Sequence, residues 1–186
     1  ARLHGRIISD GIGSPDVPSF DIDNAGGATA VLQHMYATGR RRIAMITGPD
    51  WLPCTQRPVE AYRRTMQEAG LAPRLVRGDF TPAGGRRGVR EVLRRWPDTD
   101  AIFAISDAPA LGAIAELRAC GVRVPDDVAV AGFDDIPLAE LSAPALTTAT
   151  HPVDQIAAGA AAAVLNEVRV PPVTIYPSEL VLRESA

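Results

Sequence analysis

The chain has 186 residues, of which 46% are hydrophobic and 22% charged, and its formal net charge is −3. This composition is typical of a globular protein with a substantial core, and it argues against an extended nucleic-acid surface. No apolar run approaches the roughly 20 residues that a membrane span needs, so no membrane partner is expected.

Helix-like and strand-like segments alternate along the chain. Residues 25–38 predict a helix, with Asp23 or Asn24 as its N-cap and Gly39 at its end. The strands are too apolar to have a solvated face, so the alternation predicts an α/β fold with a parallel sheet covered on both sides. The later elements are strands at 43–47, 74–77, 101–105, 128–131 and 174–182, and helices at 58–69, 82–95, 108–119 and 155–168.

Ligands of such sheets bind beyond the carboxyl ends of the strands. Trp51 follows the first of these strands, Phe80 the second, Ser106 the third and Asp134 the fourth. Carboxylates and hydroxyls bond to ligand hydroxyl groups, and aromatic faces cover C–H surfaces. This edge of the sheet therefore suits a polyhydroxylated ligand.

Two aspartate pairs flank the strand at 128–131. Asp126 and Asp127 precede it, after Pro125, and predict a turn with Asx-type hydrogen bonds. Asp134 and Asp135 follow it, at the ligand edge. The second pair is interpreted as meeting the ligand, with helix capping of the next segment as the alternative for either residue.

The stretch VPDDVAVAGFDD, followed by PALTT, resembles the signature of the lactose/galactose-repressor family of bacterial transcription regulators. Further strings continue the resemblance in the family's order over nearly all of the chain: DNAGGATAVLQHMYATGRRRIAMITG, AYRRTMQEAGL, GDF, AIFAISDAPALGAIAELRACG and ELVLRES. Five such strings in series make the resemblance specific.

The resemblance implies a sensor domain like periplasmic sugar-binding proteins, with two α/β lobes, three crossing strands and a ligand cleft between the lobes. In the implied division, the carboxy-side lobe is complete and the amino-side lobe is partial, as in a fragment truncated at its amino end. Residues 1–22 belong to the partial amino-side lobe, 23–149 to the carboxy-side lobe, 150–172 to a helix returning to the amino-side lobe, and 173–186 to a strand closing the carboxy-side lobe. The crossings fall near 20–23, 148–150 and 170–173.

The resemblance also assigns the site residues. Asp134 matches the family's ligand-contacting aspartate after Gly-Phe/Tyr, and Phe80 matches a position that stacks on ligand rings. Ser106 occupies a position where asparagine is common, so a shorter hydroxyl replaces an amide. Asp10 lines up with an acidic contact from the other lobe.

Two further candidates fit the family pattern less closely. The family's arginine falls at Pro58, and Arg57 lies one residue earlier. Arg57 could still reach the cleft if Pro58 began the helix at its first position and left Arg57 at the cap. Trp51 is either a platform for a sugar or a residue that packs the loop.

Enzymatic chemistry has little support in the sequence. The phosphate-binding patterns GxGxxG and GxxxxGK are absent, and no Ser/His/Asp or Cys/His arrangement can be assembled. Cys54, Cys120 and three histidines are too few and too scattered for a disulfide framework or a metal site. The chain is therefore expected to be no enzyme, to use no cofactor and to reside in the cytoplasm.

The resemblance implies three partners: a small sugar-like effector (a sugar, a related polyol or a nucleobase), a second copy in a homodimer, and operator DNA. The DNA would be bound only through an amino-terminal head that is absent from these 186 residues. One alternative is a transport-associated sugar-binding protein of the same fold, which PALTT and ELVLRES disfavour. The other is a nucleotide-dependent α/β enzyme, which the missing phosphate loop disfavours.

Overall fold

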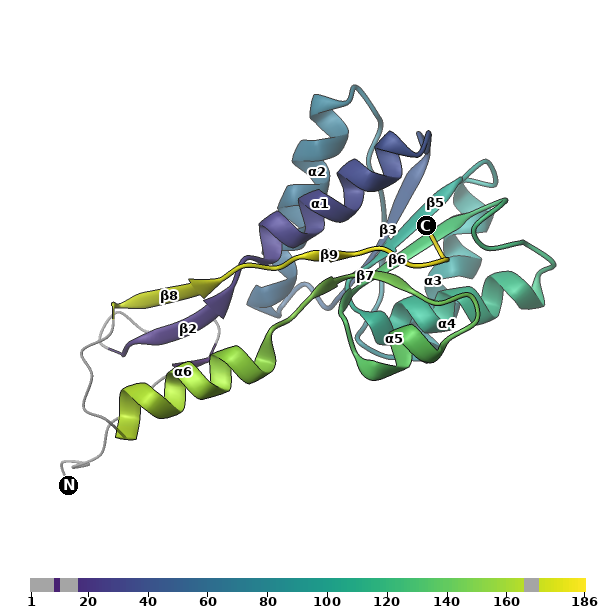
Figure 1. Cartoon of the computed structure of the whole chain (residues 1–186). Helices are drawn as coiled ribbons and strands as arrows, with labels where there is room; N and C mark the ends of the chain where they lie inside the picture. Colours follow the sequence, from purple (N-terminus) through teal and green to yellow (C-terminus); the bar gives the residue numbers. More distant parts are fainter. Residues whose placement is uncertain (1–8, 11–16, 166–170) are drawn as a thin grey trace.

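The structure, a computed structural model, describes residues 9–10, 17–165 and 171–186. It has a body built on a large sheet and a narrower extension built on a small sheet (Figure 1). We use "body" for the large sheet with its helices, and "extension" for the described residues of the small sheet with helix α6.

The large sheet has six strands in the order β4-β3-β5-β6-β7-β9. The first five run parallel to their neighbours, and β9 is antiparallel to β7. The predicted parallel sheet is therefore confirmed. Its strands are β3 (Ile43–Thr47), β4 (Arg74–Arg77), β5 (Ala101–Ala104), β6 (Ala129–Asp134), β7 (Thr147–Thr150) and β9 (Leu180–Val181).

Helices cover both faces of this sheet because successive side chains of its strands point to opposite sides. Ile43 and Met45 of β3 pack in one buried cluster with helices α1 and α2, whereas Ala44 and Ile46 pack in a second cluster with α3 and α4. All four residues are at most 1% exposed, which explains why the strand reads as a continuous apolar run. The helices are α1 (Asn24–Ala37), α2 (Gln56–Glu68), α3 (Pro82–Arg95) and α4 (Asp107–Ala119).

Helices α3 and α4 approach each other through glycine. A Cβ added at Gly85 would overlap the carbonyl oxygen of Pro109, and one added at Gly112 would overlap that of Pro82. Each glycine thus faces the backbone of the opposite helix, in contacts that no larger residue allows. This contact fixes the position of α4, whose first residue lies at the ligand edge.

The extension contains a parallel sheet in the order β1-β2-β8, covered by α6. Phe20 of β2 and Tyr176 of β8 stack with ring centroids 6.4 Å apart. A Cβ at Gly159 of α6 would overlap the hydroxyl of Tyr176, so the alanine- and glycine-rich helix lies close against this sheet. The elements are β1 (Ser9–Asp10), β2 (Ser19–Ile22), β8 (Val173–Tyr176) and α6 (Val153–Leu165).

The sequence predicts one closing strand at 174–182, and this prediction is wrong. The segment forms two strands in different sheets: β8 pairs with β2 of the extension, and β9 pairs with β7 of the body. Pro177, which has no N–H to donate, lies between them. The third crossing between the sheets therefore runs over 177–179 and not near 170–173, of which 170 lies outside the described residues.

The first two crossings agree with the prediction. The chain leaves β2 at Ile22 and enters α1 at Asn24, with the Asp23 carboxylate capping the helix by accepting the amide of Gly26 at 2.8 Å. It leaves β7 at Thr150 and enters α6 at Val153. Two short helices were not predicted: the 3₁₀ turn η1 (Pro53–Thr55) and α5 (Pro137–Leu141).

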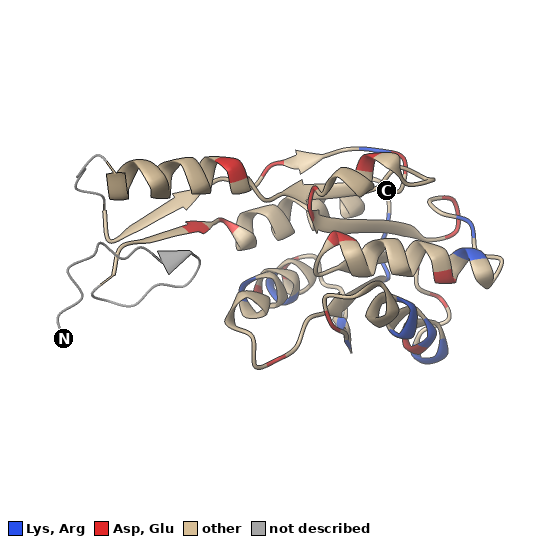
Figure 2. Cartoon of the chain, turned by 90° about the horizontal axis from the view of Figure 1, so that it is seen from below, with Lys and Arg blue, Asp and Glu red and all other residues tan. Residues whose placement is uncertain are grey.

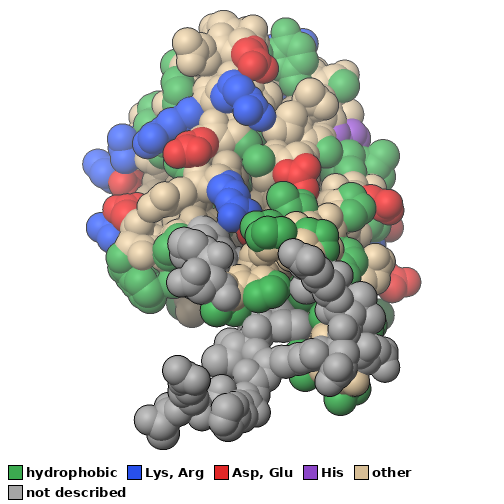
Figure 3. Space-filling model, turned by 90° about the vertical axis from the view of Figure 1, so that its left-hand side faces the viewer, with side chains coloured by type: hydrophobic (Ala, Val, Ile, Leu, Met, Phe, Trp, Pro, Cys, Tyr) green, Lys and Arg blue, Asp and Glu red, His purple; other side chains and the backbone are tan. Residues whose placement is uncertain are grey.

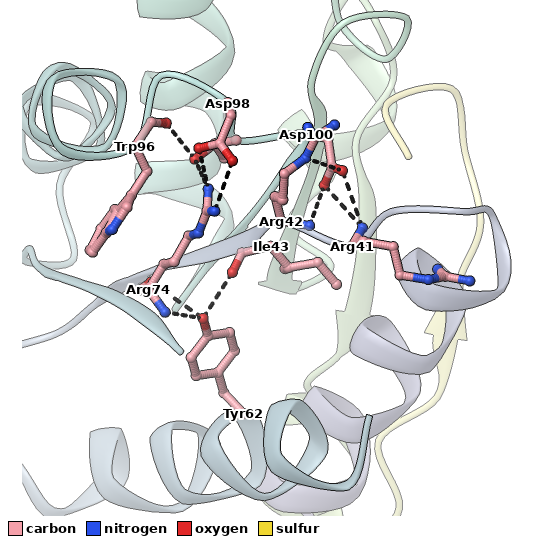
Figure 4. Close-up of polar contacts among 9 residues, drawn as sticks. Arg41, Arg42, Ile43, Tyr62, Arg74, Trp96, Asp98 and Asp100 are labelled. Carbon is pink, nitrogen blue, oxygen red and sulfur yellow. Dashed lines mark hydrogen bonds and ion pairs between the residues drawn. The ribbon is translucent and has the colours of Figure 1, made fainter. Parts of the chain in front are cut away.

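The amino edge of the large sheet is closed by buried polar contacts (Figure 4). The Asp100 carboxylate accepts the backbone amides of Arg41 and Arg42, the latter at 2.9 Å. The Tyr62 hydroxyl donates to the carbonyl of Ile43 at 2.8 Å and accepts the amide of Arg74 at 2.7 Å. The hydrogen bonds of these backbone groups at the amino edge are thus made within the protein.

The predicted turn before β6 is confirmed, also at the amino edge, but its side-chain hydrogen bonds join Asp127 to Arg123 and are not of the expected Asx type. The Asp127 carboxylate accepts the amide of Arg123 at 2.8 Å and two bonds from the Arg123 guanidinium. These bonds lower the pKa of Asp127 to about 2. Asp126 forms a longer ion pair with the same arginine, at 3.4 Å. The first aspartate pair therefore serves the turn.

Charges on the body are mixed in sign (Figure 2). Arg86 and Arg90 of α3 both pair with Glu116 of α4, at 3.5 and 2.5 Å. The described part of the extension contains acidic residues and no arginine or lysine. Within the described residues, no helix is long and apolar enough to cross a membrane.

Candidate functional site

Four of the predicted site residues lie at the carboxyl edge of the large sheet. Asp134 is the last residue of β6, and Ser106 is the N-cap of α4, two residues after the end of β5. Phe80 follows β4 and is 38% exposed, and Trp51 lies in the loop after β3 and is 75% exposed. The exposure of Trp51 does not fit the alternative in which it packs the loop.

Asp134 lines two neighbouring recesses, of about 650 and 330 Å³. They lie where the body meets the extension, because their walls come from the loop after β6, from the crossing between β7 and α6, and from the crossing between β8 and β9. Trp51, Phe80, Ser106 and Arg57 do not line them. The residues common to both recesses are Asp134, Asp135, His151, Pro152 and Gln155.

His151 is held directly beside Asp134. Its backbone amide donates to the Asp134 carbonyl at 3.1 Å, and its Nδ1 lies 3.6 Å from Asp134 Oδ1. Sequence reasoning missed this residue because His151 is isolated in the sequence. The available signal was its position one residue after the predicted crossing at 148–150, since crossings between two lobes border the space between them.

The backbone at the two aspartates after the strand is unusual. Asp134 has φ 109° and Asp135 has φ 56°, values that residues with a side chain seldom adopt. Such conformations persist only where surrounding contacts impose them, and they are concentrated at functional sites. The carboxylate of Asp135 pairs with Arg183 at 2.7 Å, which ties it to the segment after β9. Of the two aspartates, Asp134 is the one with no arginine partner among the described ion pairs.

Beneath this loop lies Asp107, a fully buried carboxylate. Its Oδ1 accepts the Thr148 hydroxyl at 2.6 Å and its Oδ2 accepts the Ile136 amide at 2.9 Å. Burial raises the pKa of Asp107 to about 6, although both hydrogen bonds act in the opposite direction. Sequence reasoning did not select Asp107, even though it follows Ser106 at the ligand edge.

Arg57 does not point to these recesses. Its guanidinium forms a 2.6 Å ion pair with Asp21 of β2, so it connects the body to the extension. The helix begins at Gln56, two residues earlier than predicted, and Arg57 lies within its first turn and not at its cap. Pro58 is tolerated there because first-turn amides have no partner within the helix. The expected capping geometry for Arg57 is therefore wrong.

Trp51 and Cys54 belong to one loop, which connects β3 to α2. A Cβ at Gly48 would overlap both Thr55 and Phe80, which places Phe80 against the start of this loop. Partial burial raises the pKa of the Cys54 thiol, and the charges of Asp134 and Asp21 act in the same direction. Phe80 therefore packs at the start of this loop, and the Cys54 thiol senses the charge of Asp134.

Asp10 lies in β1, where its backbone is in register with Phe20 of β2. Its side chain lies outside the described part of the structure, so its contact with a ligand stays a prediction. Among the residues that the structure describes, no three histidine, cysteine, aspartate or glutamate side chains are grouped so that they could hold a metal ion.

Residues 32–186 match the family of the periplasmic binding protein-like domain. The chain belongs to this family. This periplasmic binding protein-like domain is 42% identical over 147 residues to the transcriptional regulator CelR of Thermobifida fusca, covering 77% of the chain and 43% of CelR. It spans about half the length of the curated relatives that it matches.

Two solved structures resemble the domain over 96% of its length. A CelR–cellobiose complex superimposes with a TM-score of 0.86 at 35% identity, and the chain covers 58% of it. A lactose complex of a LacI-family regulator from Arthrobacter sp. FB24 gives 0.86 at 29% identity, with 70% of that chain covered. These relatives are named as transcriptional regulators, so the resemblance to the lactose/galactose-repressor family is confirmed.

Proposed function

We propose that the chain is the effector-sensing domain of a bacterial transcription regulator and binds a small sugar in the recesses beside Asp134. The observation that supports this best is the position of Asp134 at the junction of body and extension, where a ligand contacts both. Carboxylate, imidazole and amide groups from Asp134, His151 and Gln155 line the recess, and such groups bond to sugar hydroxyls. The cellobiose and lactose bound by the two similar structures support the same ligand class.

In this proposal the body corresponds to the carboxy-side lobe of the sensor and the extension to part of the amino-side lobe. Ligand bound between them changes their relative orientation, which is the coupling that a regulator needs. A homodimer, operator DNA bound through a head outside these 186 residues, and a cytoplasmic location complete the proposal. Effector and operator sites of such regulators are coupled by roughly 1–3 kcal/mol.

The test is a thermal-shift screen of cellobiose, lactose and ribose, followed by calorimetric titration of each sugar that binds. The variant Asp134→Ala should weaken binding by roughly 10- to 100-fold, because a hydrogen bond to a charged group contributes about 1.5–3 kcal/mol. Asp126→Ala is the matched control, since Asp126 lies at the opposite edge of the same sheet. A sugar that binds wild type and Asp134→Ala equally would refute the site.

A further inference from the structure

The carboxylate of Asp107 joins three segments under the carboxyl edge. Asp107 begins α4, Thr148 comes from β7, and Ile136 from the loop that follows β6. Both hydrogen bonds to the carboxylate come from outside α4. An aspartate that only capped this helix would accept amides of the helix's own first turn. The contacts of Asp107 therefore point to a role outside the helix.

Gly132 and Thr148 both contact this carboxylate closely. A Cβ at Gly132 of β6 would overlap Asp107 Oδ1, so β6 can approach the carboxylate only with glycine at this position. Thr148 is also fully buried, and its hydroxyl is directed to the same oxygen. A buried carboxylate is costly, and β6, β7 and the loop each accommodate it.

We propose that Asp107 is a positioning residue, which holds the loop after β6 in the shape that directs Asp134 to the ligand. The inference rests on the proposed function of Asp134. The left-handed backbone at Asp134 and Asp135 is unfavourable for aspartate, and the amide held by Asp107 belongs to the next residue, Ile136. The Thr148 bond ties the same carboxylate to β7, whose end leads into the crossing that carries His151.

The experiment compares Asp107→Ala with Asp107→Asn in the full chain, by amide NMR and by titration with cellobiose, lactose and ribose. Asp107→Ala should abolish the protection of the Ile136 amide, shift the Asp134 amide resonance and weaken sugar binding by at least about 10-fold. Asp107→Asn keeps an oxygen for the Ile136 amide and an amide group for the Thr148 hydroxyl. It should therefore recover most of the Ile136 protection and most of the sugar affinity. Asp107→Ser is the substitute if the alanine variant does not fold.

Asp100→Ala is the matched control. Asp100 is also a buried carboxylate that accepts backbone amides, but at the amino edge of the sheet (Figure 4). It should lower stability and leave sugar affinity unchanged. This variant separates a general loss of stability from a change in the shape of the loop.

The outcomes separate the two proposals. An Ile136 amide that stays protected in Asp107→Ala overturns the positioning role, whether or not any sugar binds. Release of Ile136 with unchanged sugar affinity overturns it as well. If no sugar binds wild type, the proposed function fails, and the Ile136 protection and Asp134 resonance still decide whether Asp107 holds the loop.

Discussion

Asp107 and Asp127 show how two aspartates of one chain acquire opposite properties. Burial raises the pKa of Asp107 to about 6, whereas hydrogen bonds from Arg123 lower that of the exposed Asp127 to about 2. Asp107 thus changes charge within a range of pH that is easily reached in solution, and Asp127 stays ionised there. The buried carboxylate is the one under the candidate site.

A pH-dependent stability follows from the position of Asp107. The folded protein holds the Asp107 proton more tightly than the unfolded chain, whose aspartates have a pKa of 3.8. Its contribution to stability is therefore complete below pH 3.8 and is lost as the pH rises through about 6. Between pH 4 and 7, wild type should lose up to about 3 kcal/mol relative to Asp107→Asn.

The measurement is the free energy of urea unfolding of both proteins at several pH values in that range. Carboxylates with a lowered pKa, such as those of Asp79 and Asp98, make the free energy of unfolding rise with pH. They are present in both proteins, so their effect cancels in the difference between the two. Parallel curves for the two proteins would contradict the raised pKa.

At the scale of elements, local sequence signals predicted most of the body. The strands 43–47 and 74–77 and the helix 82–95 have the predicted bounds, because glycine, proline and capping residues mark their ends. The closing strand and the position of Arg57 were predicted incorrectly. Both depend on which distant segment the chain meets, and no local pattern encodes that choice.

The candidate site also contains residues that could be predicted from the sequence and residues that could not. Asp134 could be predicted because it follows an apolar strand, and ligands of parallel sheets bind at that edge. The neighbours His151 and Asp107 could not be ranked from sequence, since their importance comes from contacts with residues far along the chain: His151 with Asp134, and Asp107 with Thr148.

The contact between α3 and α4 gives a prediction at this scale. Replacing an unstrained helical glycine by alanine generally stabilises a protein by up to about 1 kcal/mol. Gly85→Ala and Gly112→Ala should instead destabilise the fold by about 1–3 kcal/mol, because each new methyl group meets backbone of the opposite helix. The free energy of urea unfolding of each variant, compared with wild type, shows whether the stability falls or rises. A gain in stability for either variant would show that the two helices can separate without cost.

For the whole molecule, the junction between body and extension is narrow. Among the described residues, three crossings, the Asp21–Arg57 ion pair and one hydrophobic cluster shared by both parts connect them. The extension also presents apolar side chains to solvent, and Figure 3 shows hydrophobic side chains on this side of the molecule. The exposed ones in the extension are Val153, Val164, Leu165, Val173 and Ile175.

Amide hydrogen exchange should therefore differ between the two parts. Helix α6 buries Ile156 and Ala163, whereas α4 buries eight of its 13 residues. With fewer buried contacts, α6 should open more readily, and its amides should exchange at least about 10-fold faster than those of α4. Mass-spectrometric exchange at two protein concentrations tests this. Equal protection of both helices in dilute solution would contradict this prediction. Protection of α6 that increases with protein concentration would indicate association through α6.

The two tryptophans of the chain lie at opposite edges of the large sheet. Trp51 stands in solvent at the carboxyl edge, and Trp96 is stacked against Arg95 with its ring centroid 4.3 Å from the guanidinium, at the amino edge. Replacing Trp96 by phenylalanine would leave a single indole emitter, exposed to solvent at the carboxyl edge. The molecule thus carries an intrinsic fluorescent probe, whose emission colour and quenching report on the surroundings of the loop after β3 without an added dye.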